Sequence, residues 1–269
     1  MRVAWPPAVV QWVRRAHRRV FYPTLAVLFP TDCFVCREPL GAVQHLGACA
    51  SCWAGLQLLE PPICAGCGLP RPETTDLLGP AAGRCAVCIL APPSTDGVRA
   101  VVAYDRVARA ILLRAKLGRR PELLERLGHQ LAAATHALHL SAGCSMIVPL
   151  PSHPWMTLRR GFSPARILAR HVARRMALPL HGRLLVKRVG SPMTVKRLGG
   201  RTRRDRAAET FRVRGSAAGA RLLLVDDVMT TGASIEGAAR ALKQAGAREV
   251  RAVAWARTLP TSSGRGPVV

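Results

Sequence analysis

Between residues 96 and 257, short apolar runs alternate with amphipathic stretches. The apolar runs are rich in Val, Leu and Ile, which predicts buried strands at residues 97–104, 145–151, 184–189, 210–214, 221–228 and 248–256. The amphipathic stretches carry apolar residues three or four positions apart, which predicts helices at residues 106–117, 121–139, 164–176 and 234–245. Apolar strands alternating with helices are typical of an α/β fold with a largely parallel sheet. We therefore predict an α/β domain over residues 96–257.

The N-terminal segment follows a different pattern. Residues 1–32 form an apolar and basic leader that prolines interrupt, so no stretch reaches the roughly 18 apolar residues of a membrane helix. No clean signal-peptide cleavage site follows an apolar run, and we expect a cytoplasmic protein without a transmembrane segment. A basic amphipathic helix within residues 11–28 is expected to pack on its own domain, with peripheral membrane contact as the alternative. Residues 91–95 are interpreted as a linker and residues 258–269 as a flexible tail.

Eight of the nine cysteines form C-x-x-C pairs, all within residues 33–90. Two such pairs can supply the four thiolates of a tetrahedral zinc site. The sequence therefore predicts a double zinc ribbon with about two structural Zn²⁺ ions. Pairing in chain order gives one site from the first four of these cysteines and a second site from the last four: Cys33, Cys36, Cys49, Cys52, Cys64, Cys67, Cys85 and Cys88. Interleaved pairing, iron–sulfur ligation and disulfides are the alternatives.

The charge of the chain favours anionic partners. Forty Lys and Arg residues face 15 Asp and Glu residues, for a net charge of +25. The stretch from Arg126 to Arg204 holds 15 of these cations and no acid. Such a field attracts polyanions, so we predict single-stranded DNA as a partner; an arginine-rich surface with no partner is the alternative. The predicted DNA contacts are Arg201, Arg203, Arg204 and Arg206.

The strand at residues 221–228 ends in two adjacent acids and runs into a Thr-Thr-Gly-Ala-Ser turn that opens a helix. Backbone N–H groups at a helix start bind phosphate, and carboxylates bind sugar hydroxyls. The combination predicts a sugar-phosphate site formed by Asp226, Asp227, Thr230, Thr231, Gly232, Ala233 and Ser234.

At these residues the chain resembles the type I phosphoribosyltransferases, whose fingerprint is four apolar residues, two acids and such a loop. It resembles the ComF family of competence-associated proteins more closely, and this resemblance covers residues 28–256. The segments that carry it further are residues 28–36, 103–120, 147–170 and 187–206. The resemblance implies a type I phosphoribosyltransferase-like domain preceded by a small four-cysteine zinc-ribbon domain.

The resemblance also implies a function. Phosphoribosyl pyrophosphate (PRPP) with Mg²⁺ would bind at the acids and the loop, in a protein that handles single-stranded DNA during DNA uptake (natural transformation). Partners among the DNA-uptake machinery proteins are implied as well. The alternative is an active phosphoribosyltransferase that acts on an unidentified base or amine, with the pyrophosphate leaving group neutralised by Arg159, Arg160 or Lys196. Whether any transfer takes place is not decided by these residues.

Overall fold

The structure is a computed structural model of the whole chain. It describes residues 32–40, 47–71, 83–118, 120–188 and 210–260. The chain forms two compact units, residues 1–56 and residues 57–269. The predicted DNA contacts Arg201, Arg203, Arg204 and Arg206, the candidate Lys196, and most of the leader and tail lie outside the described residues.

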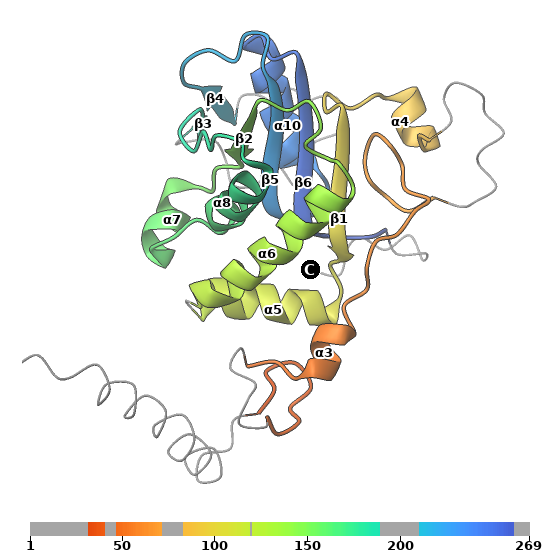
Figure 1. The fold of residues 1–269 in the computed structure, drawn as a ribbon, viewed down its shortest axis with the longest axis vertical. Helices are drawn as coiled ribbons and strands as arrows, with labels where there is room; N and C mark the ends of the chain where they lie inside the picture. Colours follow the sequence, from red (N-terminus) through yellow and green to blue (C-terminus); the bar gives the residue numbers. More distant parts are fainter. Residues whose placement is uncertain (1–31, 41–46, 72–82, 119, 189–209, 261–269) are drawn as a thin grey trace, which may run out of the picture. The chain divides into compact units, whose positions relative to one another are not determined.

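A four-stranded parallel sheet forms the centre of the second unit (Figure 1). Its strands, in the order in which they pair, are β1 (Gly97–Ala103), β6 (Glu249–Arg257), β5 (Arg221–Met229) and β2 (Met146–Pro149). All three pairings are parallel. The predicted α/β class with a largely parallel sheet is therefore confirmed.

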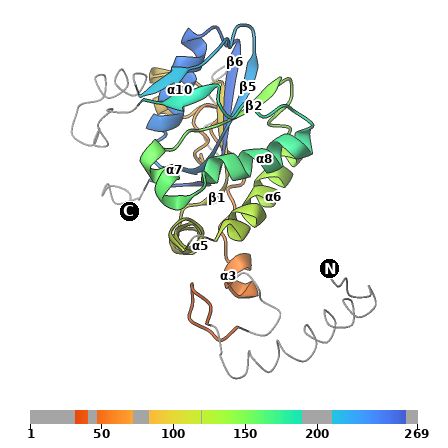
Figure 2. The same cartoon turned by 90° about the vertical axis from the view of Figure 1, so that its left-hand side faces the viewer.

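Helices cover both faces of this sheet. Figures 1 and 2 show α6 (Pro121–Ala137) and α8 (Pro164–Met176) on one face and α10 (Ala233–Gln244) on the other. The amphipathic α5 (Arg106–Leu117) packs beside α6. The connections between the parallel strands therefore cross over both faces of the sheet.

The central strand β5 is apolar on both sides because it is buried on both faces. Leu222 and Leu224 lie in one core cluster with Ile235 of α10. Leu223 and Val225 are fully buried as well and point to the opposite face, since side chains alternate along a strand. A near-continuous apolar run is therefore what this position in the sheet requires.

Smaller elements flank the sheet. An antiparallel hairpin joins β3 (Leu185–Lys187) to β4 (Phe211–Val213). The short helix α7 (Pro154–Arg160) follows β2, with proline at its first position, where a missing N–H costs nothing. The described residues also form two short helices, α3 (Ala50–Ala54) and α4 (Ala86–Leu90), and each begins directly after a cysteine.

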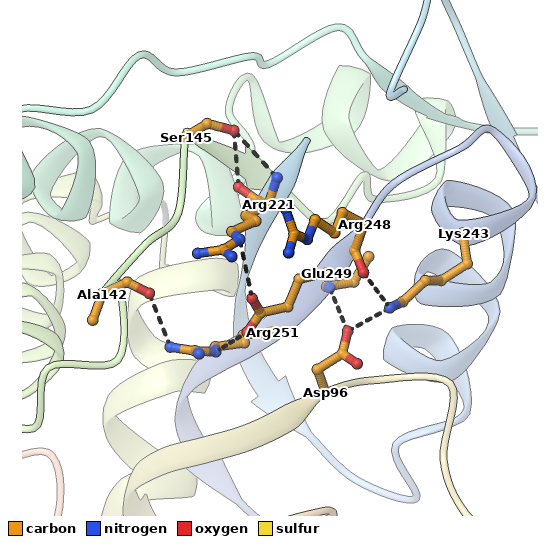
Figure 3. A network of polar contacts seen from close by, with 9 residues as sticks. Asp96, Ala142, Ser145, Arg221, Lys243, Arg248, Glu249 and Arg251 are labelled. Atoms are coloured by element: carbon orange, nitrogen blue, oxygen red, sulfur yellow. Dashed lines mark hydrogen bonds and ion pairs between the residues drawn. The ribbon is translucent and has the colours of Figure 1, made fainter. Parts of the chain in front are cut away.

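Ion pairs connect the strands at the amino edge of the sheet (Figure 3). The Glu249 carboxylate lies 2.5 Å from Arg251 Nε and 3.7 Å from Arg221 Nε. Asp96 Oδ2 lies 2.7 Å from Lys243 Nζ and accepts a hydrogen bond from the β6 backbone. These charged groups at the amino edge therefore have partners within the protein.

Helices α6 and α8 approach each other closely at Gly128. A Cβ atom there would lie 2.4 Å from Cδ2 of the buried His171 ring. That ring is held by the Glu125 carboxylate at its Nε2 and by a tilted contact with the His129 ring, 4.3 Å between centroids. The His171 ring therefore cannot retreat without losing these contacts.

Gly128→Ala should therefore lower the free energy of unfolding by about 1–3 kcal/mol, the usual cost of overpacking. This loss is expected although Ala is favoured over Gly inside a helix by about 1 kcal/mol. Thermal denaturation of both proteins measures the difference. In a His171→Ala background the same substitution should lose most of its cost, and an equal cost in both backgrounds would place the cause elsewhere.

Candidate functional site

The carboxyl ends of β2 and β5 lie side by side at the point where the sheet changes the direction of its connections. Strand β2 ends at Pro149, opposite Val225, whereas β5 continues to Met229 and pairs, among the described residues, with β6 alone. The chain leaves β2 for α8 on one face and leaves β5 for α10 on the other. In open α/β sheets, ligands bind at such a topological switch point.

Two acids of β5 lie at this point, just beyond the last residue that pairs with β2. The Asp227 backbone N–H donates a hydrogen bond to Asp226 Oδ1 at 2.9 Å. Lys116, from the last turn of α5, forms an ion pair with Asp227 Oδ2. Among the described residues this oxygen has no hydrogen bond of good geometry, so the ammonium is what balances its charge.

The pKa values of the two acids shift in opposite directions. Burial raises the pKa of Asp226 well above its usual range, and repulsion by Asp227 adds to the rise. Burial also acts to raise the pKa of Asp227, but the Lys116 ammonium outweighs it, and the net pKa lies below the usual value. Asp226 therefore loses its proton at a higher pH than Asp227 does.

The loop after β5 has the form of a phosphate cradle. Gly232 has a φ of +79°, which favours glycine, and serves as the N-cap of α10. The Thr231 hydroxyl accepts a 3.4 Å hydrogen bond from the Ala233 N–H. Thr230, Thr231 and Ser234 are exposed, and the N–H groups of the first turn have no partner within the helix. Hydroxyls, free N–H groups and the positive end of a twelve-residue helix can together hold a phosphate group.

The loop after β2 leads into α7, whose last turn carries Arg159 and Arg160. Further along, a cleft of about 660 Å³ lies between this loop and the β3–β4 hairpin. Five cations and no acid line it among the described residues: Arg183, Lys187, Arg188, Arg212 and Arg214. This cleft is therefore suited to anions.

The eight paired cysteines form two clusters, each with its sulfur atoms within 4.8 Å of one another. In the first unit the cluster consists of Cys33, Cys36, Cys49 and Cys52; in the second it consists of Cys64, Cys67, Cys85 and Cys88. Backbone N–H groups donate to sulfurs of both clusters, for example at 3.3 Å from Cys49 N to Cys33 Sγ and 3.2 Å from Cys85 N to Cys64 Sγ. Four sulfurs with N–H donors around them fit a zinc ion, and the grouping follows chain order.

The second cluster is built into the unit that holds the sheet. Arg99 Nη1 donates a 3.1 Å hydrogen bond to the Cys64 carbonyl, and Arg257 Nη1 donates to the Cys67 carbonyl. A Cβ atom at Gly68 would lie 2.5 Å from the Val98 carbonyl oxygen of β1. The division between the compact units thus falls inside the range predicted for the double ribbon, and the predicted domain ranges stay predictions.

Comparison with known proteins gives two family matches. Residues 24–89 match the family model described as a double zinc ribbon domain, and residues 157–261 match the one described as a phosphoribosyl transferase domain. The DNA utilization protein YhgH of Salmonella typhi is 28% identical over 233 residues, which covers 86% of this chain and 98% of that protein. Competence protein F of Haemophilus influenzae is 27% identical over 238 residues, covering 85% and 98%.

Among solved structures, a purine phosphoribosyltransferase from Pyrococcus horikoshii matches with 17% identity and a TM-score of 0.32, over 51% of this chain and 77% of that one. A TM-score this low does not bear on function, so the two family matches and the relatives carry the assignment. They define a protein that joins a double zinc ribbon to a phosphoribosyltransferase domain. The predicted resemblance to the ComF family is confirmed, because relatives of nearly the full length include Competence protein F.

None of the helices in the described part of the chain is both long enough and apolar enough to cross a membrane.

The two clusters predict a simple result for metal content. Elemental analysis should find about two zinc ions per chain. Cys33→Ser/Cys36→Ser should lose one ion and keep the other, and so should Cys64→Ser/Cys67→Ser. The control Cys144→Ser should keep both, because Cys144 lies outside either cluster. Loss of both ions from each double variant would contradict two independent four-cysteine sites.

Proposed function

We propose that the protein binds PRPP with Mg²⁺ at the carboxyl ends of β2 and β5. The observation that carries this proposal is the acid pair Asp226–Asp227, placed at the switch point directly before a helix-start loop. The match to a phosphoribosyltransferase domain over residues 157–261 supports it. In this proposal the acids hold the 2′- and 3′-hydroxyls of ribose, and residues 230–234 hold the 5′-phosphate.

Mg²⁺, when bound, would supply positive charge that neutralises the pyrophosphate. Oxygen ligands suit this ion, and the acid pair offers them. The Lys116 ammonium favours the ionised form of Asp227, whereas burial favours the protonated form of Asp226. Binding of the cation-bearing ligand would draw the proton from a protonated Asp226, since a carboxylate binds it better than a neutral acid does.

We further propose that single-stranded DNA binds at the cationic cleft beside the β3–β4 hairpin and at the basic stretch of residues 189–209 that connects its strands. The five cations of the cleft support this, and no ion pair to an acid is recorded for them in the described part of the chain. The exposed Trp155 lies on α7 before its two arginines and offers a face on which a base can stack. The names of the relatives, a DNA utilization protein and a competence protein, agree with a role in DNA uptake.

An active phosphoribosyltransferase is the second candidate, favoured by the domain match. In that reaction the C1–pyrophosphate bond breaks and an acceptor nitrogen bonds to C1. Arg159, Arg160 or Lys196 would neutralise the departing pyrophosphate. An assay of pyrophosphate release from PRPP with a panel of bases and amines separates the enzyme from the binding protein.

The acid pair gives the most direct test of PRPP binding. Asp226→Asn/Asp227→Asn keeps the shape of the site and removes its charge, so PRPP affinity should fall at least about tenfold, or about 1.4 kcal/mol. Calorimetric titration with PRPP and Mg²⁺ measures this, and circular dichroism checks the fold. Glu122→Gln, an exposed acid on α6, is the control and should bind normally. Equal binding by the double variant would remove the acids from the site.

The raised pKa of Asp226 predicts a pH dependence. Below this pKa the group is protonated and must lose its proton to Mg²⁺–PRPP, so affinity should fall as pH falls, by at most about tenfold per pH unit. Titrations in buffers with different ionisation enthalpies should show proton release on binding. Asp226→Asn should abolish that release. Binding without proton release in the wild type would contradict the assigned protonation.

DNA binding should depend on the position of the cations and not on net charge alone. Arg212→Gln/Arg214→Gln should weaken single-stranded DNA binding and reduce the salt slope by about 1.4, the value for two lost phosphate contacts. Arg174→Gln/Arg175→Gln removes the same charge from the exposed end of α8 and should have a smaller effect. Arg201, Arg203, Arg204 and Arg206, neutralised together, should lower both affinity and slope further. Equal effects of the two matched doubles would mean that only the net charge acts.

A further inference from the structure

A buried arginine connects the second cysteine cluster to the strand end that precedes the phosphate loop. Arg257, the last residue of β6, has only 4% of its surface exposed. Its Nη1 contacts the Cys67 carbonyl and lies 2.8 Å from the Met229 sulfur. Arg257 also stands opposite Met229 in the β5–β6 pairing. One guanidinium group therefore touches both the zinc knuckle and the last residue of β5.

Met229 in turn lies against the turn of the phosphate loop. It is 6% exposed and directly precedes Thr230. A Cβ atom at Gly232 would lie 2.7 Å from Met229 Cε, so this side chain packs closely against the turn. The Met229 carbonyl accepts a 3.0 Å hydrogen bond from Thr258 N. The position of Met229 therefore limits where the loop can lie.

The end of the loop that leads into α10 is also held, by the segment that follows the second cysteine cluster. Ser94, six residues after Cys88, donates to the Glu236 carboxylate from its N–H, at 2.9 Å, and from its hydroxyl, at 2.6 Å. Glu236 is in the first turn of α10, and its own N–H donates to the Gly232 carbonyl at 2.9 Å. Ser94, which follows the second cluster, thus holds the α10 end of the loop, and Arg257, which contacts that cluster, holds the β5 end through Met229.

The charge of the metal site completes the argument. Four thiolates around Zn²⁺ carry a net charge of −2, and Arg257 supplies a buried positive charge beside them. In the described part of the chain, Arg257 Nε has no hydrogen-bond partner, and Nη1 contacts the Cys67 carbonyl and the Met229 sulfur. Removing the metal would take away the negative charge that balances the buried guanidinium, which is costly. Arg257 would then move, and its contact with Met229 would be lost.

We propose that the second cysteine cluster is a metal-dependent brace for the phosphate loop, with Arg257 and Ser94 as the positioning residues. Loss of its zinc loosens residues 229–236, whereas loss of zinc from the first cluster does not. The consequence for PRPP rests on the proposed function; the loosening of the loop does not.

Hydrogen exchange of the full-length protein, read on peptides covering residues 229–236, tests this brace. Cys64→Ser/Cys67→Ser should speed exchange there at least about tenfold, and the matched Cys33→Ser/Cys36→Ser should leave it unchanged. Equal exchange in the two variants overturns the proposal.

Variants that keep both zinc ions separate the proposed effect on the loop from general unfolding. Arg257→Gln and Ser94→Ala should retain two zinc ions by elemental analysis and still speed exchange in residues 229–236, and Arg257→Lys should recover part of the protection. Thr95→Ala, at the neighbouring buried position, is the control for Ser94→Ala. Unchanged exchange in Arg257→Gln and Ser94→Ala overturns the proposal.

A PRPP titration of the same variants separates the brace from the proposed function. Weaker PRPP binding by Arg257→Gln is expected alongside its faster exchange. If the wild type binds no PRPP while exchange still responds, the proposed function fails and the brace stands. If PRPP binds and exchange does not respond, the brace fails and the proposed function stands.

Discussion

The site depends on the point at which β2 stops pairing with β5. Pairing ends at Val225, and β5 runs on for four residues, paired with β6 alone among the described residues. The two strands feed helices on opposite faces of the sheet, and open α/β sheets bind their ligands at such a point. The next two residues are the acids, and the helix-start loop follows within three more. A sheet edge that had to satisfy its own polar groups, as the amino edge does through Glu249 and Asp96, would have no groups left for a ligand.

Around this point, buried charges are held by partners from distant parts of the chain. Lys116 of α5 balances Asp227, and Arg257 of β6 lies between Met229 and the second cysteine cluster. An unpaired buried charge is expensive, so each of these contacts restricts how far its neighbours can move. The acid pair, the loop and the second cluster are therefore parts of one compact unit, as the division of the chain at residues 56 and 57 indicates.

Local patterns predicted most of the described helices and strands, including the strand that carries the acid pair. The helices at residues 106–117 and 164–176 begin and end where the apolar periodicity places them, and the acid pair follows the predicted strand. The C-x-x-C spacing predicted which cysteines group together. These features are encoded within a few neighbouring residues, so the sequence alone shows them.

Contacts between distant segments were not predicted. Lys116 and Asp227 are more than 100 residues apart, and no periodicity connects them; the available signal was that Lys116 is one of only four lysines in a chain with 36 arginines. Arg257 looked like one more arginine at a strand end. Helix α7 was missed because seven residues beginning with proline show too little periodicity. The range predicted for the double ribbon joined two clusters that the compact units divide, since spacing says nothing about what each cluster packs against.

The central claim is that one site holds the ribose at the acids and the phosphate at the loop. A crystal structure of the protein with PRPP and Mg²⁺ tests it most directly. The account predicts the 5′-phosphate within hydrogen-bond distance of the backbone N–H groups of residues 230–234, and the ribose hydroxyls at Asp226 and Asp227. PRPP bound elsewhere, or its 5′-phosphate held by the arginines of the cationic cleft and not by the loop, would contradict the account.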